Sequence, residues 1–127
     1  MLIIDSNVWV ALFNKNDSQH NKAKSFFDKL EMKVIIPEYV FIEVSTILLI
    51  KAGKNIAKKF IEIAQDNSDV EICLSSGELF LNTLRIFKNS AKDKLSFVDI
   101  SLLFLSESYK IITFDKNLQK AINIHKN

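Results

Sequence analysis

Four short stretches of the chain are largely apolar, with polar and charged segments between them. They cover residues 2–5, 33–37, 69–75 and 110–114. Continuous apolar runs of this length are typical of parallel strands that are buried on both faces of a sheet. A further segment near the end, "INIH" at residues 122–125, fits a strand at the sheet edge. The pattern therefore predicts four or five strands.

Segments with apolar residues at helical spacing lie between these strands. The predicted helices cover residues 6–14, 17–30, 38–52, 54–67, 75–90, 96–109 and 115–121. The alternation of strands with helices predicts an α/β sandwich with a mostly parallel sheet. The helix at 38–52 is apolar on nearly every side, which predicts a central position, and Gly53 is expected to end it. Ser75 stands three residues before Glu78, the spacing of a capping box.

The composition is that of an ordinary globular domain. Of 127 residues, 48% are hydrophobic and 25% are charged, and this composition excludes a disordered chain. A chain of this length most simply forms one domain. The formal net charge of +2 indicates no strongly basic arm. Cys73 is the one cysteine, so no internal disulfide forms, and we expect a small core residue in a reducing cytoplasm. No apolar run is long enough to cross a bilayer, and the N-terminus lacks a signal-peptide pattern. We therefore expect a cytoplasmic protein with no membrane association.

Four carboxylates stand in unusually apolar surroundings. Asp5 and Asp115 directly follow the first and fourth predicted strands, whereas Glu43 and Asp99 lie near the starts of two apolar helices. Parallel strands end at one edge of a sheet, and the helices that pack on the sheet begin at that edge. All four side chains can therefore converge, although each comes from a different part of the chain.

Helix capping is the alternative interpretation for three of these acids. Asp5 and Asp115 can each cap the helix that follows, and Asp99 stands three residues after Ser96, as in a capping box. Glu43 differs because it lies beyond the first helical turn, with no Lys or Arg in register to pair with it. A buried, unpaired carboxylate is costly, so Glu43 needs a cation, a hydrogen-bond donor or a proton.

Taken together, the four acids favour a metal site. Carboxylates that gather in a partly dry pocket repel one another, and a divalent cation removes that repulsion. Oxygen ligands without a His or Cys cluster favour Mg²⁺ or Mn²⁺ over zinc. His20 and His125 are isolated on polar segments and are expected at the surface. A site of this kind typically acts on phosphate esters.

The same residues resemble the PIN-domain family. The resemblance rests on Asp5 with Asn7 after the first strand, Glu43 in the central helix, "LSFVDISL" with Asp99, and "IITFDKNL" with Asp115. Within that family, the chain is similar to the VapC-like ribonuclease toxins of toxin–antitoxin pairs. The resemblance implies a PIN-like three-layer α/β/α sandwich, with a mostly parallel sheet of four to five strands, formed by a single domain.

The resemblance also implies a Mg²⁺- or Mn²⁺-dependent endoribonuclease. The positions it assigns are the catalytic, metal-binding Asp5, Glu43, Asp99 and Asp115, and the orienting Asn7 and Thr113. Asp5, Asp99 and Asp115 would bind the metal, and Glu43 would hold the metal or its water.

The implied partners are an RNA substrate, an antitoxin protein and a second copy of the chain. A cluster of lysines is either a solvated helix face or a track for the RNA backbone; it consists of Lys51, Lys54, Lys58 and Lys59. Two alternatives stay open: a PIN-domain RNA-processing nuclease without an antitoxin, and a catalytically inactive PIN-like module that binds RNA or serves as a scaffold.

Overall fold

A parallel sheet forms the middle of the protein. The structure, a computed structural model, describes residues 1–90 and 94–126. Within them the strands are β1 (Leu2–Ile4), β2 (Val34–Pro37), β3 (Val70–Cys73) and β4 (Lys110–Ile112). They are all parallel and lie in the order β3-β2-β1-β4, with Leu2 opposite Val34 of β2 and Lys110 of β4. The predicted α/β class and parallel sheet are confirmed.

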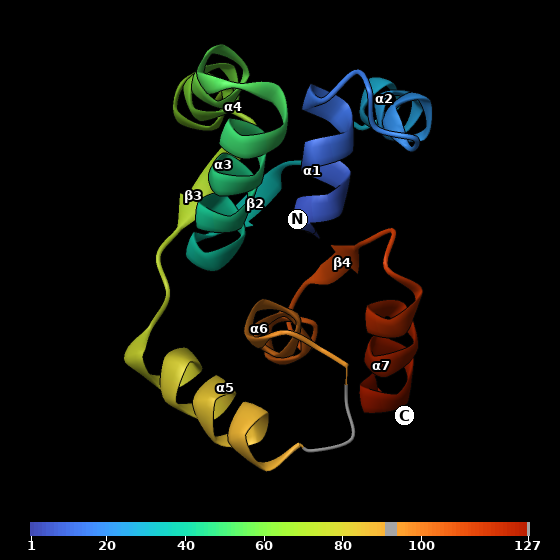
Figure 1. The fold of residues 1–127 in the computed structure, drawn as a ribbon. Coiled ribbons are helices and arrows are strands. Elements are labelled where there is room, and N and C mark those ends of the chain that lie inside the picture. Colours follow the sequence, from blue (N-terminus) through green and yellow to red (C-terminus); the bar gives the residue numbers. More distant parts are fainter. Residues whose placement is uncertain (91–93, 127) are drawn as a thin grey trace.

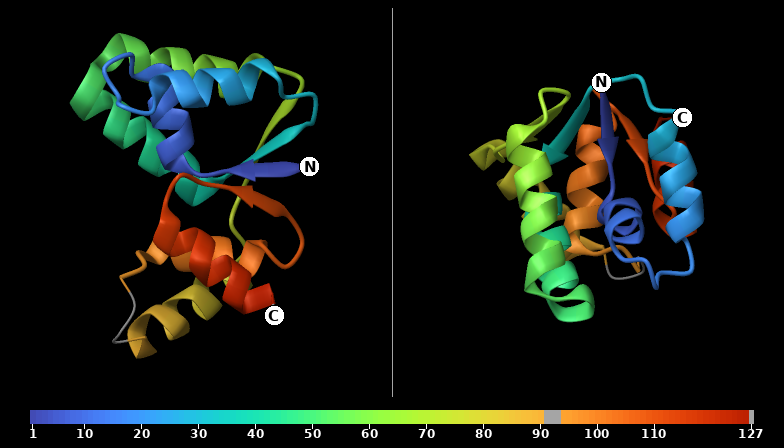
Figure 2. Two further views of the ribbon diagram at one scale, coloured as in Figure 1. Left: turned by 90° about the vertical axis from the view of Figure 1, so that its right-hand side faces the viewer. Right: turned by 90° about the horizontal axis from the view of Figure 1, so that it is seen from above.

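Helices cover both faces of this sheet. Those of the described residues are α1 (Ser6–Phe13), α2 (His20–Asp28), α3 (Glu38–Ala52), α4 (Lys54–Asp66), α5 (Gly77–Asn89), α6 (Phe97–Leu105) and α7 (Lys116–Lys126). The first four lie on one side of the sheet and the last three on the other, so the fold has three layers (Figures 1 and 2). In the described part of the chain, no helix is both long and apolar enough to cross a membrane.

An aromatic cluster lies where three helices of the first layer meet. The fully buried Phe60 of α4 is at its centre, with ring centroids 5.6 Å from Trp9, 5.7 Å from Phe13 and 5.5 Å from Phe41. These rings come from α1, α3 and α4. The cluster therefore fixes the three helices relative to one another.

Helix α3 is buried on one face only. Val44 and Leu48 are fully buried, whereas Ile42 and Ile50 are exposed, so the predicted central position holds for half of the helix. Gly53 ends the helix as predicted. Its φ of 94° lies in the left-handed region that favours glycine, and its N–H donates to the Leu48 carbonyl at 3.0 Å.

The predicted fifth strand is wrong. Residues 122–125 belong to α7, which continues from Lys116 to Lys126. Leu118 and Ile122 are both buried, four residues apart on one helical face. That apolar face holds the segment against the rest of the protein as a helix.

Two further local predictions are corrected by the structure. Cys73 is exposed and not in the core, because β3 is the edge strand, where alternate residues are half-buried and the others are exposed. The cap of α5 is Ser76 and not Ser75, since the Ser76 Oγ accepts the Leu79 N–H at 3.0 Å.

The chain changes direction across the sheet between β1 and β4. From β1 it proceeds through β2 to β3 along one half of the sheet, and it then returns to place β4 on the other side of β1. Ligands of parallel α/β folds bind at the carboxyl ends of the strands at such a switch point. Asp5 and Thr113 are the first residues after β1 and β4. The fold therefore places both residues where a site is expected.

Candidate active site

Asp5 is a buried carboxylate held by three donors. It is 3% exposed and serves as the N-cap of α1. Its Oδ1 accepts the Ser6 N–H at 2.7 Å, and its Oδ2 accepts the Thr113 hydroxyl at 2.8 Å and the Asn7 amide at 3.3 Å. These hydrogen bonds fix the direction of the side chain.

Asn7 joins the start of α1 to the end of β4. Its Nδ2 donates to the Thr113 Oγ1 at 3.1 Å, and its Oδ1 accepts the Phe114 N–H at 3.1 Å. The Thr113 hydroxyl in turn accepts the Asp115 N–H at 3.0 Å. A continuous network thus runs from Asp5 to the backbone of Asp115.

Glu43 obtains a donor from Ser6, whose role the sequence did not reveal. The Ser6 hydroxyl donates to Glu43 Oε1 and also lies 3.4 Å from Asp5 Oδ1. A hydroxyl has one proton, so Ser6 can donate to only one of the two carboxylates at a time, and its closer contact is with Glu43. Two features of the sequence could have indicated this contact. Glu43 has no Lys or Arg in register and so requires another partner, and a serine directly follows Asp5.

Asp99 and Asp115 act as helix caps, as the alternative interpretation expected. Asp99 forms a capping box with Ser96 at the start of α6. Asp115 Oδ1 accepts the backbone N–H groups of Asn117 and Leu118 at 2.8 and 3.2 Å, at the start of α7. Each cap uses one carboxylate oxygen. Capping therefore leaves a second oxygen on each residue for another ligand.

The Asp5 carboxyl is electrostatically unusual. Burial raises its pKa from 3.8 to about 6, and the negative charges of Asp99 and Glu43 act in the same direction. The hydrogen bonds from Thr113 and Ser6 partly oppose this effect. Among residues 1–90 and 94–126, no Lys or Arg forms an ion pair with any of these acids. The site is therefore short of positive charge.

Without divalent cations, the protein is expected to gain stability from Asp5 when the pH falls from 7 to 5. The folded state binds a proton at Asp5 up to a pH of about 6, whereas the unfolded chain releases it near 3.8. The folded carboxyl therefore adds stability as the pH drops through about 6, and the gain is complete below the unfolded pKa. By proton linkage it amounts to about 1 kcal/mol between these two pH values.

Urea unfolding at both pH values checks this, with Asp5→Asn as the matched variant. The difference between the wild type and the variant in the pH dependence of the free energy of unfolding gives the contribution of Asp5. An identical pH dependence in the two proteins would mean that another group is responsible.

The donor set fits a hard divalent cation. Three carboxylate oxygens accept no hydrogen bond from the described residues: Glu43 Oε2, Asp99 Oδ1 and Asp115 Oδ2. All candidate ligands are oxygen atoms, which Mg²⁺ and Mn²⁺ prefer. In the described part of the chain, however, no three acid, histidine or cysteine side chains already stand close enough to hold one ion.

The lysine cluster lies away from these acids. Lys51 is in the last turn of α3, eight residues after Glu43, which is about 12 Å along the helix axis. Lys54, Lys58 and Lys59 belong to α4, and all four lysines are exposed. The structure thus does not bring the cluster together with the acids. Its contact with RNA remains a prediction.

Comparisons with known proteins identify the family and support the fold. The family model of the PIN domain matches residues 2–123, so the chain belongs to the PIN-domain family. The fold is similar to that of VapC20 from Mycobacterium tuberculosis, which is described as a sarcin–ricin loop cleaving toxin. The TM-score is 0.85 at 21% identity, with 95% of each chain covered. No curated protein sequence gives a significant match.

Proposed function

We propose that this PIN-domain protein is a Mg²⁺- or Mn²⁺-dependent endoribonuclease that hydrolyses RNA phosphodiesters. The observation that carries the proposal is the buried Asp5 carboxylate, which stands near Glu43 and Asp99 and has no ion-pair partner among residues 1–90 and 94–126. Such a group costs stability unless a cation or a proton neutralises it. Its place at the switch point of a PIN fold favours the cation.

In this proposal Asp5, Asp99 and Asp115 bind the cation, and Glu43 holds the cation or its water. When bound, the cation would polarise a water molecule and neutralise charge on the phosphate. Because no ready cluster exists among the described residues, binding includes a movement of side chains.

The neighbouring polar residues orient the acids. Thr113 and Asn7 fix the direction of Asp5 Oδ2, and Ser6 does the same for Glu43 Oε1. A carboxylate that is already oriented loses less entropy when it binds a cation and substrate.

We further propose that the protein is the toxin of a VapBC-like pair, with an antitoxin that restrains it and a second copy as partner. The similarity of the fold to that of VapC20 supports the proposal that the protein is a toxin. The exposed apolar side chains of α3 and α5 support protein contacts; they include Ile42, Leu49, Ile50, Leu81 and Leu84. The alternative is an RNA-processing nuclease without an antitoxin. A gene for a small DNA-binding protein directly upstream, whose product suppresses cleavage, distinguishes the two.

Divalent cations are expected to stabilise the protein and to activate RNA cleavage. A concentration 100-fold above the dissociation constant of Mg²⁺ or Mn²⁺ raises the free energy of unfolding by about 2.7 kcal/mol. Thermal unfolding with Mg²⁺, Mn²⁺ or EDTA measures the stabilisation, and gel analysis of a structured RNA measures internal cleavage. Asp66→Asn, an exposed acid at the end of α4, is the control and should behave as wild type.

The outcome separates the candidate functions. Stabilisation with cleavage supports the proposal, and stabilisation without cleavage points to another substrate. A protein that binds RNA but shows no response to either cation is the inactive binding module, and the metal assignment is then wrong.

A further inference from the structure

One lysine outside the lysine cluster stands beside the candidate active site. Lys22 of α2 places its Nζ 4.7 Å from the centroid of the Phe114 ring. Phe114 lies between Thr113 and Asp115 in the chain. Its backbone N–H donates to the Asn7 Oδ1 at 3.1 Å. The ammonium group is therefore held over a residue whose backbone belongs to the hydrogen-bond network of the site.

The start of α2 is anchored, which fixes the backbone of Lys22. The His20 Nδ1 lies 2.7 Å from the Ala11 carbonyl oxygen, and Ala23 is fully buried. Lys22 lies between these two anchored residues of α2. The helix is on the same side of the molecule as the turn that joins β4 to α7 (Figures 1 and 2). Lys22 is thus held within reach of Phe114, and its exposed side chain faces solvent as well.

The positive charge of Lys22 has no ion-pair partner in the described part of the chain. The face of an aromatic ring attracts an ammonium group, but the ring has no net charge and does not neutralise it. An ammonium group also has three hydrogen-bond donors, and a ring face can contact only one side of it. Lys22 can therefore bind an anion while it remains over the Phe114 ring.

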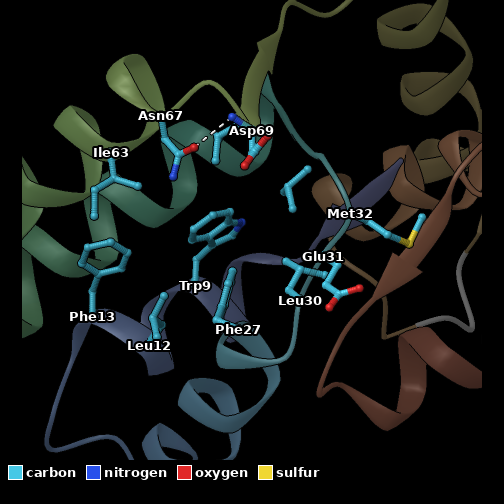
Figure 3. A pocket seen from close by; sticks show the side chains of 12 residues that line it. Trp9, Leu12, Phe13, Phe27, Leu30, Glu31, Met32, Ile63, Asn67 and Asp69 are labelled. Carbon is cyan, nitrogen blue, oxygen red and sulfur yellow. Dashed lines mark hydrogen bonds between the residues drawn. The ribbon is translucent and has the colours of Figure 1, made fainter.

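Two hollows beside α1 and α3 offer no such cation. One of about 450 Å³ lies between α3 and α6 and includes Glu43 among mostly apolar side chains. The other, of about 230 Å³, is lined by α1 and bordered by Glu31 and Asp69 (Figure 3). Among the described residues, neither lining contains Lys or Arg. Acids and apolar side chains disfavour a chain of phosphates, so the RNA backbone is favoured on the side of α2.

We propose that Lys22 binds a phosphate of the RNA next to the one that is cut, on the side where the strand passes over Phe114 toward α2. This inference rests on the proposed ribonuclease function and adds a requirement for its substrate. The cation would hold the scissile phosphate at the acids, and Lys22 supplies the positive charge that the acids lack. Lysine binds phosphate as a point charge, so this contact positions the RNA without selecting a base.

Lys22→Gln should therefore raise the KM for RNA by roughly three- to tenfold, the effect of one such contact, with the loss in KM and not in kcat. The logarithm of the affinity should also depend less on the logarithm of the salt concentration, by roughly 0.7 in slope, because one contact with a single strand is lost. Lys24→Gln is the matched control. Lys24 is exposed, lies two residues further along α2 and so points to the opposite side of the helix.

RNA with one methylphosphonate linkage locates the phosphate, because this linkage has no charge. The linkage is placed in turn at each position beside the cut. At one position the wild type should lose roughly three- to tenfold in KM, whereas Lys22→Gln should lose nothing further. Lys22→Arg keeps the charge and should respond as the wild type does. If every linkage costs the wild type and Lys22→Gln equally, Lys22 does not contact the RNA backbone.

Phe114→Leu separates the charge from its position. The variant removes the ring and keeps the ammonium group, so the salt dependence should equal that of the wild type. The affinity for RNA should fall by less than in Lys22→Gln. A larger loss in Phe114→Leu than in Lys22→Gln would show that the ring stacks on a base and that the ammonium group is not the contact.

RNA binding without cleavage separates this inference from the proposed function. Fluorescence anisotropy of a labelled RNA is measured in EDTA on the Asp5→Asn protein, with and without Lys22→Gln. Binding that depends on Lys22, in a protein whose wild type does not cleave RNA, overturns the nuclease and supports Lys22. Cleavage by the wild type, together with equal affinity and equal salt dependence for Lys22→Gln, overturns Lys22 alone. A protein that binds no RNA overturns both.

Discussion

The Asp5→Asn variant is expected to lose RNA cleavage by at least about a hundredfold while it remains folded. An amide has nearly the shape of a carboxylate, so its oxygen can still accept the Ser6 N–H, while its NH₂ group can donate to the Thr113 hydroxyl in place of accepting from it. The negative charge that attracts a divalent cation is lost, however, and such cations contribute several kcal/mol to phosphoryl chemistry, which is at least about a hundredfold in rate. Initial rates on a defined RNA with saturating Mn²⁺ measure the loss.

The same substitution separates catalysis from stability. Because burial disfavours the charged form of Asp5, Asp5→Asn should unfold at the same or a higher urea concentration than wild type at pH 7 in EDTA. It should also lose the stabilisation by Mg²⁺. Asp66→Asn again serves as the control with full activity. If Asp5→Asn cleaves RNA at the wild-type rate, the assignment of Asp5 to the active site is wrong.

The second large effect concerns stability: Phe60→Ala is expected to lower the free energy of unfolding by about 3–5 kcal/mol. Phe60 is fully buried and contacts the rings of Trp9, Phe13 and Phe41. Its removal leaves a cavity at the point where three helices meet, and the surrounding rings cannot close it without leaving their own contacts. Urea unfolding, followed by circular dichroism, measures the change.

A loss of this size is a large fraction of the stability of a domain, which is commonly about 5–15 kcal/mol. Leu81→Ala is the matched control, because Leu81 is 63% exposed on α5. Its effect should stay within about 0.5 kcal/mol. Equal losses in the two variants would mean that the aromatic cluster does not hold the helices together.

The position of Asp5 and Asp115 at the carboxyl edge of the sheet could be predicted from sequence because it depends on topology. A residue that follows a parallel strand lies at the carboxyl edge whatever its side-chain conformation, and this applies to Asp5 and Asp115 alike. The contact of Ser6 with Glu43 could not be predicted in this way. It depends on the angle at which α3 crosses α1, and the pattern of apolar and polar residues does not determine that angle.

The wrong predictions for residues 122–125 and for Cys73 have similar causes. Four residues such as "INIH" fit both a strand and a helix, and only the buried partner of Ile122, one turn earlier at Leu118, decides for the helix. The apolar character of residues 69–75 predicts a core position for Cys73. Whether a strand lies at the edge of the sheet is decided by the order β3-β2-β1-β4, which the pattern of β3 itself does not encode.

The contact between Asp5 and Thr113 joins positions 108 residues apart in the chain. Contacts of such long range form slowly, because a large loop must close before they are made. During synthesis from the N-terminus, Asp5 emerges first, and the threonine that holds it emerges only after β4. The nascent protein therefore carries Asp5 for most of its synthesis without the threonine hydroxyl that orients its side chain, and the hydrogen-bond network around Asp5 can be completed only near the end of synthesis.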